Sequence, residues 1–593
     1  MAGTLHMGSD ALRDDSKRNS TSPHHIHLVA AIDFGTTFSG IAWQYCVEFQ
    51  QSPLQIQTKR WIGCDRTGFI SEKTPTALLL NSKKEFKAFG GEAETIYADL
   101  ADENAHHGYY FFRHFKMMLY KETLTKDTML TDDQGHKVEA KVVFEHCIRY
   151  LKGVLVEELD KSGNLVQENE IFWVLTVPAI WNEAAKQFMR MAATSAGIPN
   201  KRLSLALEPE AAAIHAKENF TQRLPGSIHI QRYSPGTKYM VLDLGGGTVD
   251  VTVREVLEDR SLKELHKASG NDWGGLTVNS TFLDFFEKLL GTKVMEELRS
   301  MKPVFLDLER EIELKKRSTG KDGRVLLVLP GELFEIYKKI HGKDLTNSVA
   351  YETRYAGLLD IKRGKMRVES SIIQEFFKPA IDRILEHTSK VLEKMKGVRE
   401  IILVGGFAEC HLVSDAIQDA FSDHRVLAPN DKSLAVLKGA VLFGQDPTGS
   451  VKTRMCNATY GISVMRFFLE GYDDEKKKDM NKGTPFCKDV FEPLAKIGQT
   501  FDVGDTVQTD VEPYKADMTK MSVRLYKSQS EDPKYVTDSD CVLLGKMTVD
   551  MPDTSRGLNR KVEVSLTFGD VELKCRGKDC STGKIVETSL DLL

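Results

Sequence analysis

The sequence predicts a long α/β region followed by a shorter, mostly β region, and three observations carry this prediction. Up to about residue 447, short continuous apolar runs, which are typical of buried strands, alternate with segments of helical periodicity. After residue 447, apolar and polar residues alternate with the period of half-exposed strands. The third observation is a pair of similar glycine-rich segments in the α/β region, each at the end of an apolar run.

The first ordered element is expected at 27–33, where HLVAAID is a short continuous apolar run. We expect residues 1–26 to be disordered, because they are polar and rich in Ser, Asp, His and Arg. The segment IFWVLTV at 171–177 predicts another buried strand. A helix is expected to follow it, because apolar residues recur with helical spacing after Asn182, a typical N-cap, and Gly197 offers a stop.

Helical spacing returns at 372–395, where Pro379 is expected to kink or divide the helix. The apolar run 401–406 predicts a further buried strand that leads into a helix. In the β region, 562–568 alternates between apolar and polar residues, which predicts one dry and one wet face. The charged stretch 471–483 is expected to be a solvated loop.

Composition and charge exclude several classes of protein. With 593 residues, 41% hydrophobic and 28% charged, the chain has the balance of a soluble globular protein. A net charge of −5 gives no basic field for a nucleic-acid partner. No apolar run approaches the ~18 residues of a transmembrane segment, and the N-terminus lacks the apolar core of a signal peptide. Nine cysteines without a C-x-x-C pair favour free thiols, so we expect a cytoplasmic protein.

The two similar segments are AAIDFGTTFSGIAW at 30–43 and MVLDLGGGTVDVTV at 240–253. Each is an apolar strand that ends in Asp-x-Gly and is followed by a second apolar run, so each predicts a strand–turn–strand unit. The G-x-x-x-x-G-K-[ST] loop, which opens a helix instead, is absent from the sequence. A single such turn is most simply a tight hairpin without a ligand, whereas two facing turns would clamp a nucleotide between two lobes.

The residue types in these turns suit phosphate and magnesium. Glycine lacks a Cβ, so its backbone N–H can approach phosphate closely, and this role falls to Gly35, Gly245, Gly246 and Gly247. Hydroxyl donors are Thr36, Thr37 and Thr248. Carboxylates that suit hydrated Mg²⁺ are Asp33, Asp243 and Asp250. A third pair of glycines, Gly405 and Gly406, suits either an adenosine contact or a tight strand-to-helix turn.

Five motifs occur in the order in which the 70-kDa heat-shock protein family has them, and the chain resembles that family: DFGTTFSG, VPAIWNEAAKQFMRMAA, LEPEAAAIHA, LDLGGGTVDVTV and LVGGFAE. The spellings FFRHFKMML and LKGAVLFGQDP are similar to its divergent 12A and 12B branch. The resemblance covers roughly residues 28–593. It implies a two-lobed, actin-like (ribonuclease-H-like) ATPase domain at 27–447, then a diverged, substrate-binding-like β-domain at 448–593 without the family's helical lid.

The resemblance also implies roles for residues that match family motifs. Asp33 and Asp243 would hold the water shell of Mg²⁺, and Glu208 would bind a magnesium water or orient the attacking one. Lys116 would stabilise charge during phosphoryl transfer, and Thr248 would lie near the γ-phosphate. The contacts to adenine and ribose would come from Glu313, Lys316 and Arg317. Taken alone, Lys116 also suits a surface lysine, and the trio also suits a set of intrahelical ion pairs.

The resemblance implies an ATP-binding, atypical chaperone-like stress protein with ATP or ADP and Mg²⁺ as cofactors and a weak ATPase activity. Nucleotide state would control the hold of the β-domain on a polypeptide client or a specific protein partner. Two departures favour an alternative, a nucleotide-gated adaptor with little or no hydrolysis: the family's helical lid and its apolar linker are both missing. Lys186 stands where the family has an arginine, and this change loses a bidentate pairing that would couple the domains. A small-molecule kinase of the same superfamily is a weaker alternative, and the sequence identifies no co-chaperone.

Overall fold

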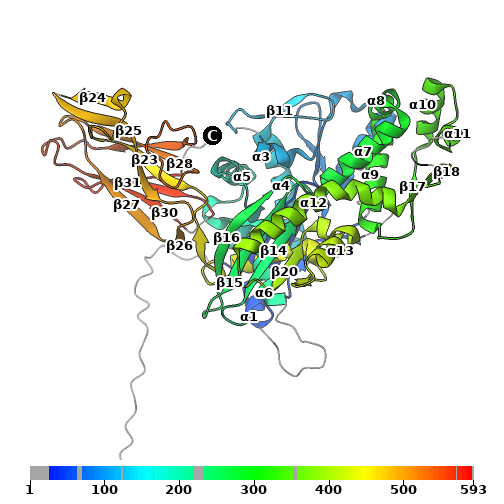
Figure 1. The fold of residues 1–593 in the computed structure, drawn as a ribbon, viewed down its shortest axis with the longest axis horizontal. Helices are drawn as coiled ribbons and strands as arrows, with labels where there is room; N and C mark the ends of the chain where they lie inside the picture. The colour runs from blue at the N-terminus through cyan, green and yellow to red at the C-terminus, as the bar shows by residue number, and fades with distance from the viewer. Residues whose placement is uncertain are drawn as a thin grey trace, which may run out of the picture.

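The structure, a computed structural model, has a large α/β part and a smaller β part that lies to one side of it (Figure 1). It describes residues 26–62, 70–121, 124–163, 166–219, 233–350, 355, 357–481, 483–568 and 571–589. The segment 1–25, for which the sequence predicts disorder, lies outside the described residues. The predicted fold class, an α/β region followed by a β region, is confirmed.

The first lobe of the α/β part is built on a mixed sheet. Its strands, in spatial order, are β13 (Leu203–Leu207), β12 (Ile171–Val177), β1 (Leu28–Phe34), β2 (Phe38–Tyr45) and β3 (Gln57–Thr58), with β6 (Thr74–Pro75) also paired to β2. β1 is antiparallel to β2, its hairpin partner, and parallel to β12 on its other side. The two apolar runs predicted as buried strands are β1 and β12, and every residue of β1 is buried.

Helices and small sheets surround this sheet. The helix predicted after 171–177 is α5 (Glu183–Ser195), and the Asn182 side chain caps it by accepting a hydrogen bond of 2.9 Å from the backbone N–H of Ala185. The other helices are α1 (Cys46–Gln51), α2 (Gly91–Asp102), α3 (Met118–Lys121), α4 (Ala140–Lys161) and the 3₁₀ turn η2 (Phe115–Met117). The remaining strands are β4 (Trp61–Ile62), β5 (Ile70–Ser71), β7 (Ala77–Leu80), β8 (Phe86–Phe89), β9 (Tyr110–Arg113), β10 (Met129–Thr131) and β11 (Lys137–Glu139).

The second lobe repeats the arrangement of the first. Its sheet contains, in order, β21 (Arg425–Leu427), β20 (Glu400–Val404), β14 (Lys238–Leu244), β15 (Val249–Val256), β16 (Leu262–Asn271), β22 (Val451–Met455) and β26 (Thr500–Asp502). β14 and β15 form a hairpin, and β14 is parallel to β20, just as β1 is antiparallel to β2 and parallel to β12. Each glycine-rich segment is therefore the turn of a hairpin in the middle of its own sheet.

A helical layer covers the outer end of the second lobe. It comprises α7 (Gly275–Leu290), α8 (Thr292–Ser300), α9 (Lys302–Ser318), α10 (Gly331–His341), α11 (Leu345–Ala350), α12 (Ser370–Lys394) and α13 (His411–Ala420), with a small sheet of β17 (Arg324–Val328), β18 (Leu359–Lys362) and β19 (Lys365–Glu369). Pro379 lies inside α12 and does not divide it, contrary to one of the two outcomes expected. Its exposed position lets water satisfy the carbonyl that loses its hydrogen bond.

Two helices join the sheets of the two lobes, namely α6 (Glu208–Asn219) and α14 (Ala435–Gln445). Their small and apolar side chains form one buried cluster with residues of both sheets, such as Val29 and Val241. The helices touch closely, since a Cβ on Gly439 would lie 1.8 Å from the backbone oxygen of Ala211. Glu208, the first residue of α6, is thereby held between the two lobes.

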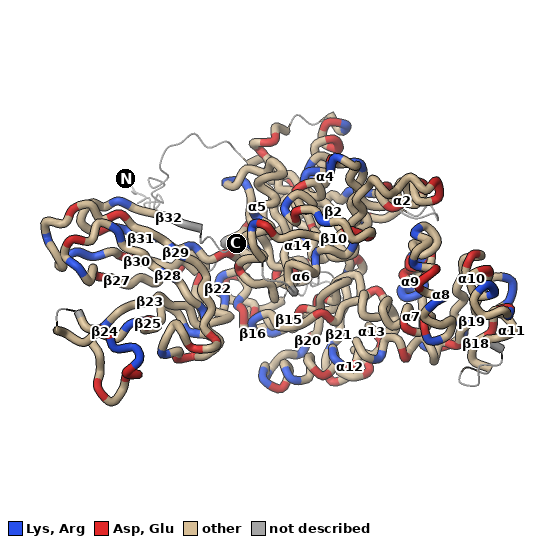
Figure 2. Tube along the Cα trace, turned by 90° about the horizontal axis from the view of Figure 1, so that it is seen from above, with Lys and Arg blue, Asp and Glu red and all other residues tan. Residues whose placement is uncertain are grey.

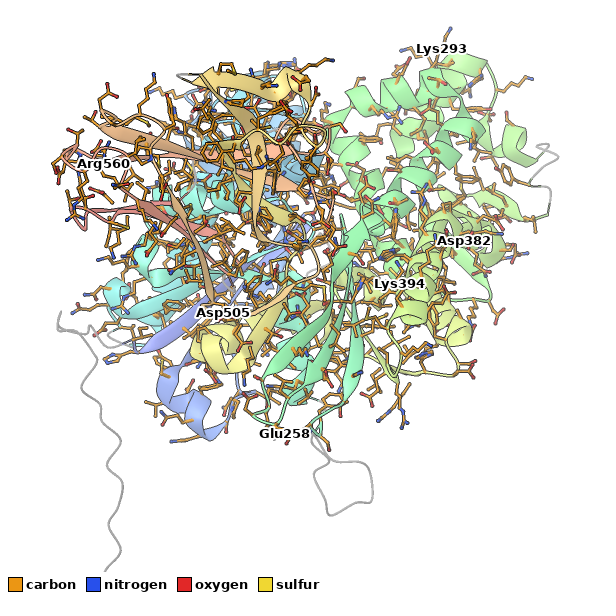
Figure 3. All side chains as sticks on the ribbon, turned by 60° about the vertical axis from the view of Figure 1, so that its left-hand side comes forward. Glu258, Lys293, Asp382, Lys394, Asp505 and Arg560 are labelled. Carbon is orange, nitrogen blue, oxygen red and sulfur yellow. The ribbon has the colours of Figure 1, made fainter. Side chains whose placement is uncertain are left out.

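The β part consists of two facing sheets. One has the order β24 (Lys478–Asn481), β25 (Thr484–Ala495), β23 (Thr459–Phe467), β28 (Lys520–Ser528) and β29 (Val542–Asp550), and the other β27 (Thr506–Val511), β30 (Val562–Thr567), β31 (Lys574–Asp579) and β32 (Ile585–Ser589). The dry face predicted for 562–568 is confirmed, because Val562, Val564 and Leu566 are buried. Arg560 (Figure 3) is also buried, and its guanidinium donates to several backbone carbonyls. The expected loop 471–483 instead contains strand β24, which pairs with β25.

The junction between the parts is a strand of the second lobe. After the short helix α15 (Pro447–Ser450), β22 pairs in parallel with β16. Strand β26, which comes later in the sequence, pairs with β22 on its other side. The sheet of the second lobe thus continues to the edge of the β part. Lys and Arg are interspersed with Asp and Glu along both parts (Figure 2). Among the described residues, none of the helices has the length and apolar character needed to cross a membrane.

Candidate functional site

The turns of the two hairpins touch each other across the gap between the lobes. A Cβ on Gly246 would lie 2.3 Å from Thr37 Oγ1, and a Cβ on Gly247 would lie 2.7 Å from Thr36 Oγ1. Because no real Cβ tolerates such distances, only glycine fits at these two positions with the turns in contact. The backbone N–H of Gly245 donates to the carbonyl of Thr248 at 2.9 Å, which closes the second turn.

A cleft of about 300 Å³ lies beside the touching turns. Sixteen of the residues predicted from the sequence line it: Asp33, Gly35, Thr36, Thr37, Lys116, Glu208, Asp243, Gly245, Gly246, Gly247, Thr248, Glu313, Lys316, Arg317, Gly405 and Gly406. Asp250, predicted as a magnesium ligand, is not part of this lining. It is buried opposite Asp243 in the β14–β15 pair. The structure therefore brings both glycine turns, both lobes and all but one of these residues to one cleft.

Lys116 and Glu208 form a buried ion pair in this cleft. Lys116 Nζ lies 2.7 Å from Glu208 Oε1 and 5.1 Å from the centre of the Trp181 ring. Only 2% of the Lys116 side chain is exposed, so it is not a surface lysine. Burial raises the pKa of Glu208 despite the opposing charge of Lys116. The pair places an ammonium and a carboxylate side by side next to the glycine turns.

Asp33 is held by a lysine that sequence reasoning missed. Lys73 Nζ lies 2.6 Å from Asp33 Oδ2, and the Thr176 hydroxyl donates to Asp33 Oδ1 at 2.9 Å. Burial raises the pKa of Asp33, but the charge and hydrogen bond of Lys73 outweigh it and hold this pKa below its ordinary value. The sequence signal for Lys73 is weak, because it lies outside both glycine-rich segments and reaches Asp33 only through strand pairing.

The cleft carries more negative charge than its lysines neutralise. Burial and the nearby carboxylates of Glu208 and Asp250 raise the pKa of Asp243 well above its ordinary value. Burial, followed by the charge of Glu208, raises the pKa of Asp250 to about 7. One Asp250 carboxylate oxygen is buried and has no hydrogen-bond partner among the described residues. A cation placed here would offset the repulsion between the carboxylates and would interact favourably with the unpaired oxygen of Asp250.

These features fit a hydrated magnesium ion with a nucleotide polyphosphate. Among the described residues, no three His, Cys, Asp or Glu side chains converge closely enough to bind a metal directly. Magnesium commonly keeps several waters and uses one or two carboxylates together with substrate phosphates. Asp33 and Asp243 line the cleft from opposite lobes, and the glycine turns give phosphate oxygens room to approach backbone N–H groups.

The side chains of Glu313, Lys316 and Arg317 lie together on α9 at the other end of the cleft. Lys316 Nζ lies 2.6 Å from Glu313 Oε2, and Arg317 Nε donates to Glu313 Oε1 at 3.1 Å. Although burial opposes it, the charges of Lys316 and Arg317 lower the pKa of Glu313 to about 2. The Arg317 guanidinium also stacks over the Phe38 ring of the opposite lobe at 4.7 Å. The trio thus forms intrahelical ion pairs and lines the cleft at the same time.

The last predicted glycines close the cleft from the side of β20. Gly405 has a φ of +89°, and a Cβ there would lie 2.4 Å from the backbone oxygen of Leu244. Both the backbone conformation and the close approach therefore require glycine. Gly406, by contrast, has nothing within 4 Å of an added Cβ. Ser433 and Leu434 complete this wall, which is less charged than the end near Asp33.

Comparisons with known proteins agree with this architecture. The Hsp70 protein family model matches residues 111–335. Human heat shock 70 kDa protein 12A is 33% identical over 98% of this chain and 94% of its own length. Human heat shock 70 kDa protein 12B is 32% identical over 95% of this chain and 91% of its length. The chaperone protein DnaK of Thermosipho africanus (strain TCF52B) is 23% identical over 94% of this chain and 78% of its length.

Proposed function

This chain belongs to the Hsp70 family, in the branch of the 12A and 12B heat shock proteins, and from that premise we propose that it couples ATP binding and weak hydrolysis to the binding of a polypeptide partner. Membership makes it an ATP-binding, chaperone-like protein in general terms. The observation that carries the specific proposal is the buried Lys116–Glu208 pair beside two touching glycine turns. A glycine cradle, an ammonium and a carboxylate are the groups that phosphoryl transfer to water requires.

The protein's side chains divide the work of ATP binding. The turns Gly35–Thr37 and Gly245–Thr248 bind the phosphates through backbone N–H and hydroxyl groups. Asp33 and Asp243 hold the waters of Mg²⁺, and Asp250 supports them from behind the cleft. The metal, when bound, neutralises phosphate charge. The base and ribose lie between α9, with Glu313, Lys316 and Arg317, and the wall of Gly405 and Gly406.

Hydrolysis depends on the Lys116–Glu208 pair. Glu208 orients the attacking water, since it lines the cleft near both turns and its raised pKa makes its carboxylate a better proton acceptor. Lys116 donates to the phosphate oxygens on which charge develops, and its burial strengthens that interaction. The Thr248 hydroxyl lies near the γ-phosphate. Because Lys116 is already committed to Glu208 at 2.7 Å, we expect slow turnover rather than a fast enzyme.

Coupling to the β part is supported by a buried ion pair at the junction. Glu210 lies two residues after Glu208 in the first turn of α6 and is buried. Its carboxylate accepts two hydrogen bonds from Arg454 on junction strand β22, at 2.5 and 3.2 Å. A change at Glu208 on nucleotide binding therefore has a short path, through one helical turn, to the strand that leads into the β part.

A second group of contacts joins the first lobe to the β part. Lys186 pairs with Glu183 at 2.9 Å and also donates to the backbone oxygen of Val571 at 3.2 Å. Arg190 donates to Glu572 at 2.6 Å. The lysine that stands in place of the family's arginine thus still contacts the β part, and this supports coupling between the parts whether or not ATP is hydrolysed.

The partner is proposed to bind an apolar patch of the β part. The patch comprises exposed side chains of β23 and of the segment after it: Met465, Phe467, Leu469 and Tyr472. Phe467 is 65% exposed and stacks on Phe486 at 5.0 Å between ring centres. Exposed aromatic and apolar groups next to paired strands suit the side chains of an extended polypeptide.

The partner proposal is tested with a fluorescent, carboxymethylated unfolded polypeptide. Its dissociation rate from the full chain is measured with MgATP and with MgADP. The proteins are the wild type, Phe467→Ser and the control Leu543→Ser, which removes another exposed apolar residue, outside the patch. We expect faster dissociation with one nucleotide than with the other, and weaker binding only for Phe467→Ser. Binding that ignores nucleotide, or equal effects of both substitutions, would refute the proposal.

A further inference from the structure

Lys73 is placed at the phosphate end of the cleft by the pairing of three strands. Ser39 pairs with Thr74 and Phe38 with Pro75, so the next residue of β2, Gly40, lies opposite Lys73. Gly40 is in turn the cross-strand partner of Asp33 on β1. Lys73 and Asp33 therefore lie two strands apart, about 10 Å between backbones, with a glycine between them.

The glycine opens the path that the lysine uses. A Cβ on Gly40 would lie 3.1 Å from Lys73 Cγ, so the lysine stem lies directly over this position. The long lysine side chain crosses Gly40, which has no side chain, and so reaches Asp33 at 2.6 Å. Arginine or lysine side chains elsewhere in the cleft, such as Lys116, approach from different elements. The path of the Lys73 side chain over Gly40 is therefore set by the pairing of β6 with β2.

The ammonium of Lys73 retains donors for a second partner. Among the described residues, it donates one side-chain hydrogen bond, to Asp33, whereas an ammonium group has three donors. Its side chain is 18% exposed and lines the cleft with Thr37 and Asp243. Because it lies next to Asp33, the ammonium group is at the end of the cleft where the glycine turns would bind phosphate.

We propose that Lys73 is a second phosphate-binding cation, which holds the terminal phosphates of the nucleotide and neutralises Asp33 when little magnesium is present. This inference rests on the nucleotide-binding function proposed above and deepens it. Four carboxylates meet in and behind the cleft, namely those of Asp33, Glu208, Asp243 and Asp250. Lys73 and Lys116 offset part of that charge permanently. Nucleotide binding should accordingly depend less on divalent metal in this cleft than in a cleft that has Lys116 but lacks Lys73.

The test is calorimetric titration of ATP into the full chain, in excess Mg²⁺ and in EDTA. The variants are Lys73→Met, Lys73→Gln, which keeps a hydrogen-bond donor to Asp33 without charge, and Lys73→Arg. Lys83→Met, at an exposed lysine of the same lobe, is the matched control. We expect Lys73→Met and Lys73→Gln to weaken binding by about tenfold in Mg²⁺ and by about 100-fold in EDTA. Lys73→Arg and Lys83→Met should stay within about threefold of the wild type.

The outcomes separate this inference from the function on which it rests. A wild type that binds ATP, with Lys73→Gln unchanged or weakened by the same factor in both conditions, would overturn the role of Lys73 and leave nucleotide binding intact. A wild type that binds no ATP in either condition would overturn both. Direct titration of inorganic tripolyphosphate gives an independent readout, because its affinity should fall in Lys73→Gln but not in the control Lys83→Met, which lies outside the cleft.

Discussion

Each lysine at the phosphate end of the cleft is held by one carboxylate, Lys116 by Glu208 and Lys73 by Asp33. These pairs keep buried charges compensated before any nucleotide arrives, and a broken pair would leave an unpaired charge in a buried site. The sequence identifies Lys116 through a short motif around it. The sequence does not identify Lys73. The role of this lysine depends on the β2–β6 register and on Gly40, and no motif around Lys73 indicates either of them.

The contact between the glycine turns gives the first prediction. Gly246→Ala would place a methyl group 2.3 Å from Thr37 Oγ1, and so would push the turns apart or rotate Thr37. Overpacking of this kind costs about 1–3 kcal/mol, and we expect ATP affinity to fall by about tenfold or more. The measurement is the dissociation constant of MgATP.

The matched control is Gly331→Ala, because an added Cβ there has nothing within 4 Å and the residue begins helix α10. Alanine at this position should leave ATP affinity unchanged and should not lower the melting temperature. An equal loss of affinity in both variants would contradict the account of the touching turns.

At the scale of elements, junction strand β22 is where the two parts of the molecule meet, and it gives the second prediction. Arg454→Ala removes two hydrogen bonds from the buried Glu210 and leaves it with the longer ion pair to Arg254, at 3.8 Å. An unpaired buried charge costs about 3–5 kcal/mol, so we expect a smaller loss of stability here. We expect undocking of β22 and loss of any nucleotide-dependent change in its protease sensitivity. The control is Lys452→Ala on the same strand, whose exposed ion pair with Asp259 contributes about 1 kcal/mol or less. Retained nucleotide response in Arg454→Ala would contradict the proposed path.

The segment that carries the apolar patch gives a prediction about pH. Asp473 accepts hydrogen bonds from Arg466 at 2.7 and 2.9 Å and from the backbone N–H of Leu469 at 2.9 Å. The hydrogen bond from Arg466 is the main cause that lowers the pKa of Asp473 to about 2. Because the folded pKa lies below the unfolded one, this carboxylate stabilises the fold above about pH 4 and loses that contribution as the pH falls toward 2.

The measurement is acid unfolding followed by the tyrosine and phenylalanine signals, because the β part contains no tryptophan. Asp473→Asn should lower stability at neutral pH and should make the unfolding free energy less sensitive to pH between about 4 and 2. Asp532→Asn, at an exposed carboxylate paired with Lys496, is the control and should behave like the wild type. An unchanged pH dependence in Asp473→Asn would show that this ion pair does not hold the segment.

Elements were predictable where a local pattern decides them. Apolar runs placed β1, β12 and β20, and capping residues placed both ends of α5. The charged stretch 471–483 misled, because strand β24 gains its hydrogen bonds from β25 rather than from an apolar pattern of its own. Junction strand β22 was also missed, since docking onto β16 and the Glu210–Arg454 pair link residues far apart in sequence.

At the scale of the whole molecule, ion pairs between α9 and the first lobe connect the two lobes beside the cleft, and we expect them to oppose its opening. Arg113 pairs with Glu309 at 2.5 Å, and Arg310 pairs with Glu94 at 3.0 Å. These pairs are partly exposed, so salt screens them. We expect dissociation of bound ADP to accelerate by about two- to fivefold for Arg310→Ala and to accelerate with ionic strength in the wild type.

The readout is the off-rate of a fluorescent ADP analogue by stopped flow. The control is Lys390→Ala, which breaks an exposed pair with Glu386 on α12, away from the gap between the lobes. Equal off-rates in the wild type and Arg310→Ala at low salt would contradict the closing role of these pairs.

The general architecture was predictable because the two hairpin segments repeat, and a repeated strand–turn–strand unit predicts two similar lobes. The relative placement of the β part was not predictable, because contacts such as Arg190 with Glu572 join segments with no shared pattern. The motifs were sufficient to predict which residues line the cleft, with the exception of Asp250. Asp250 is buried in β15 opposite Asp243, and this strand pairing is not visible in the motif.

The most direct test of the central claim is single-turnover hydrolysis of Mg-ATP by the purified chain, beside Lys116→Ala. Both proteins are first shown to bind ATP and to unfold cooperatively, so that a lost rate reports chemistry. We predict that the wild type hydrolyses bound ATP slowly and that Lys116→Ala is slower by about 100-fold or more. Wild-type hydrolysis no faster than that of Lys116→Ala, with ATP bound in both, would contradict the ATPase account and leave a nucleotide-gated adaptor in its place.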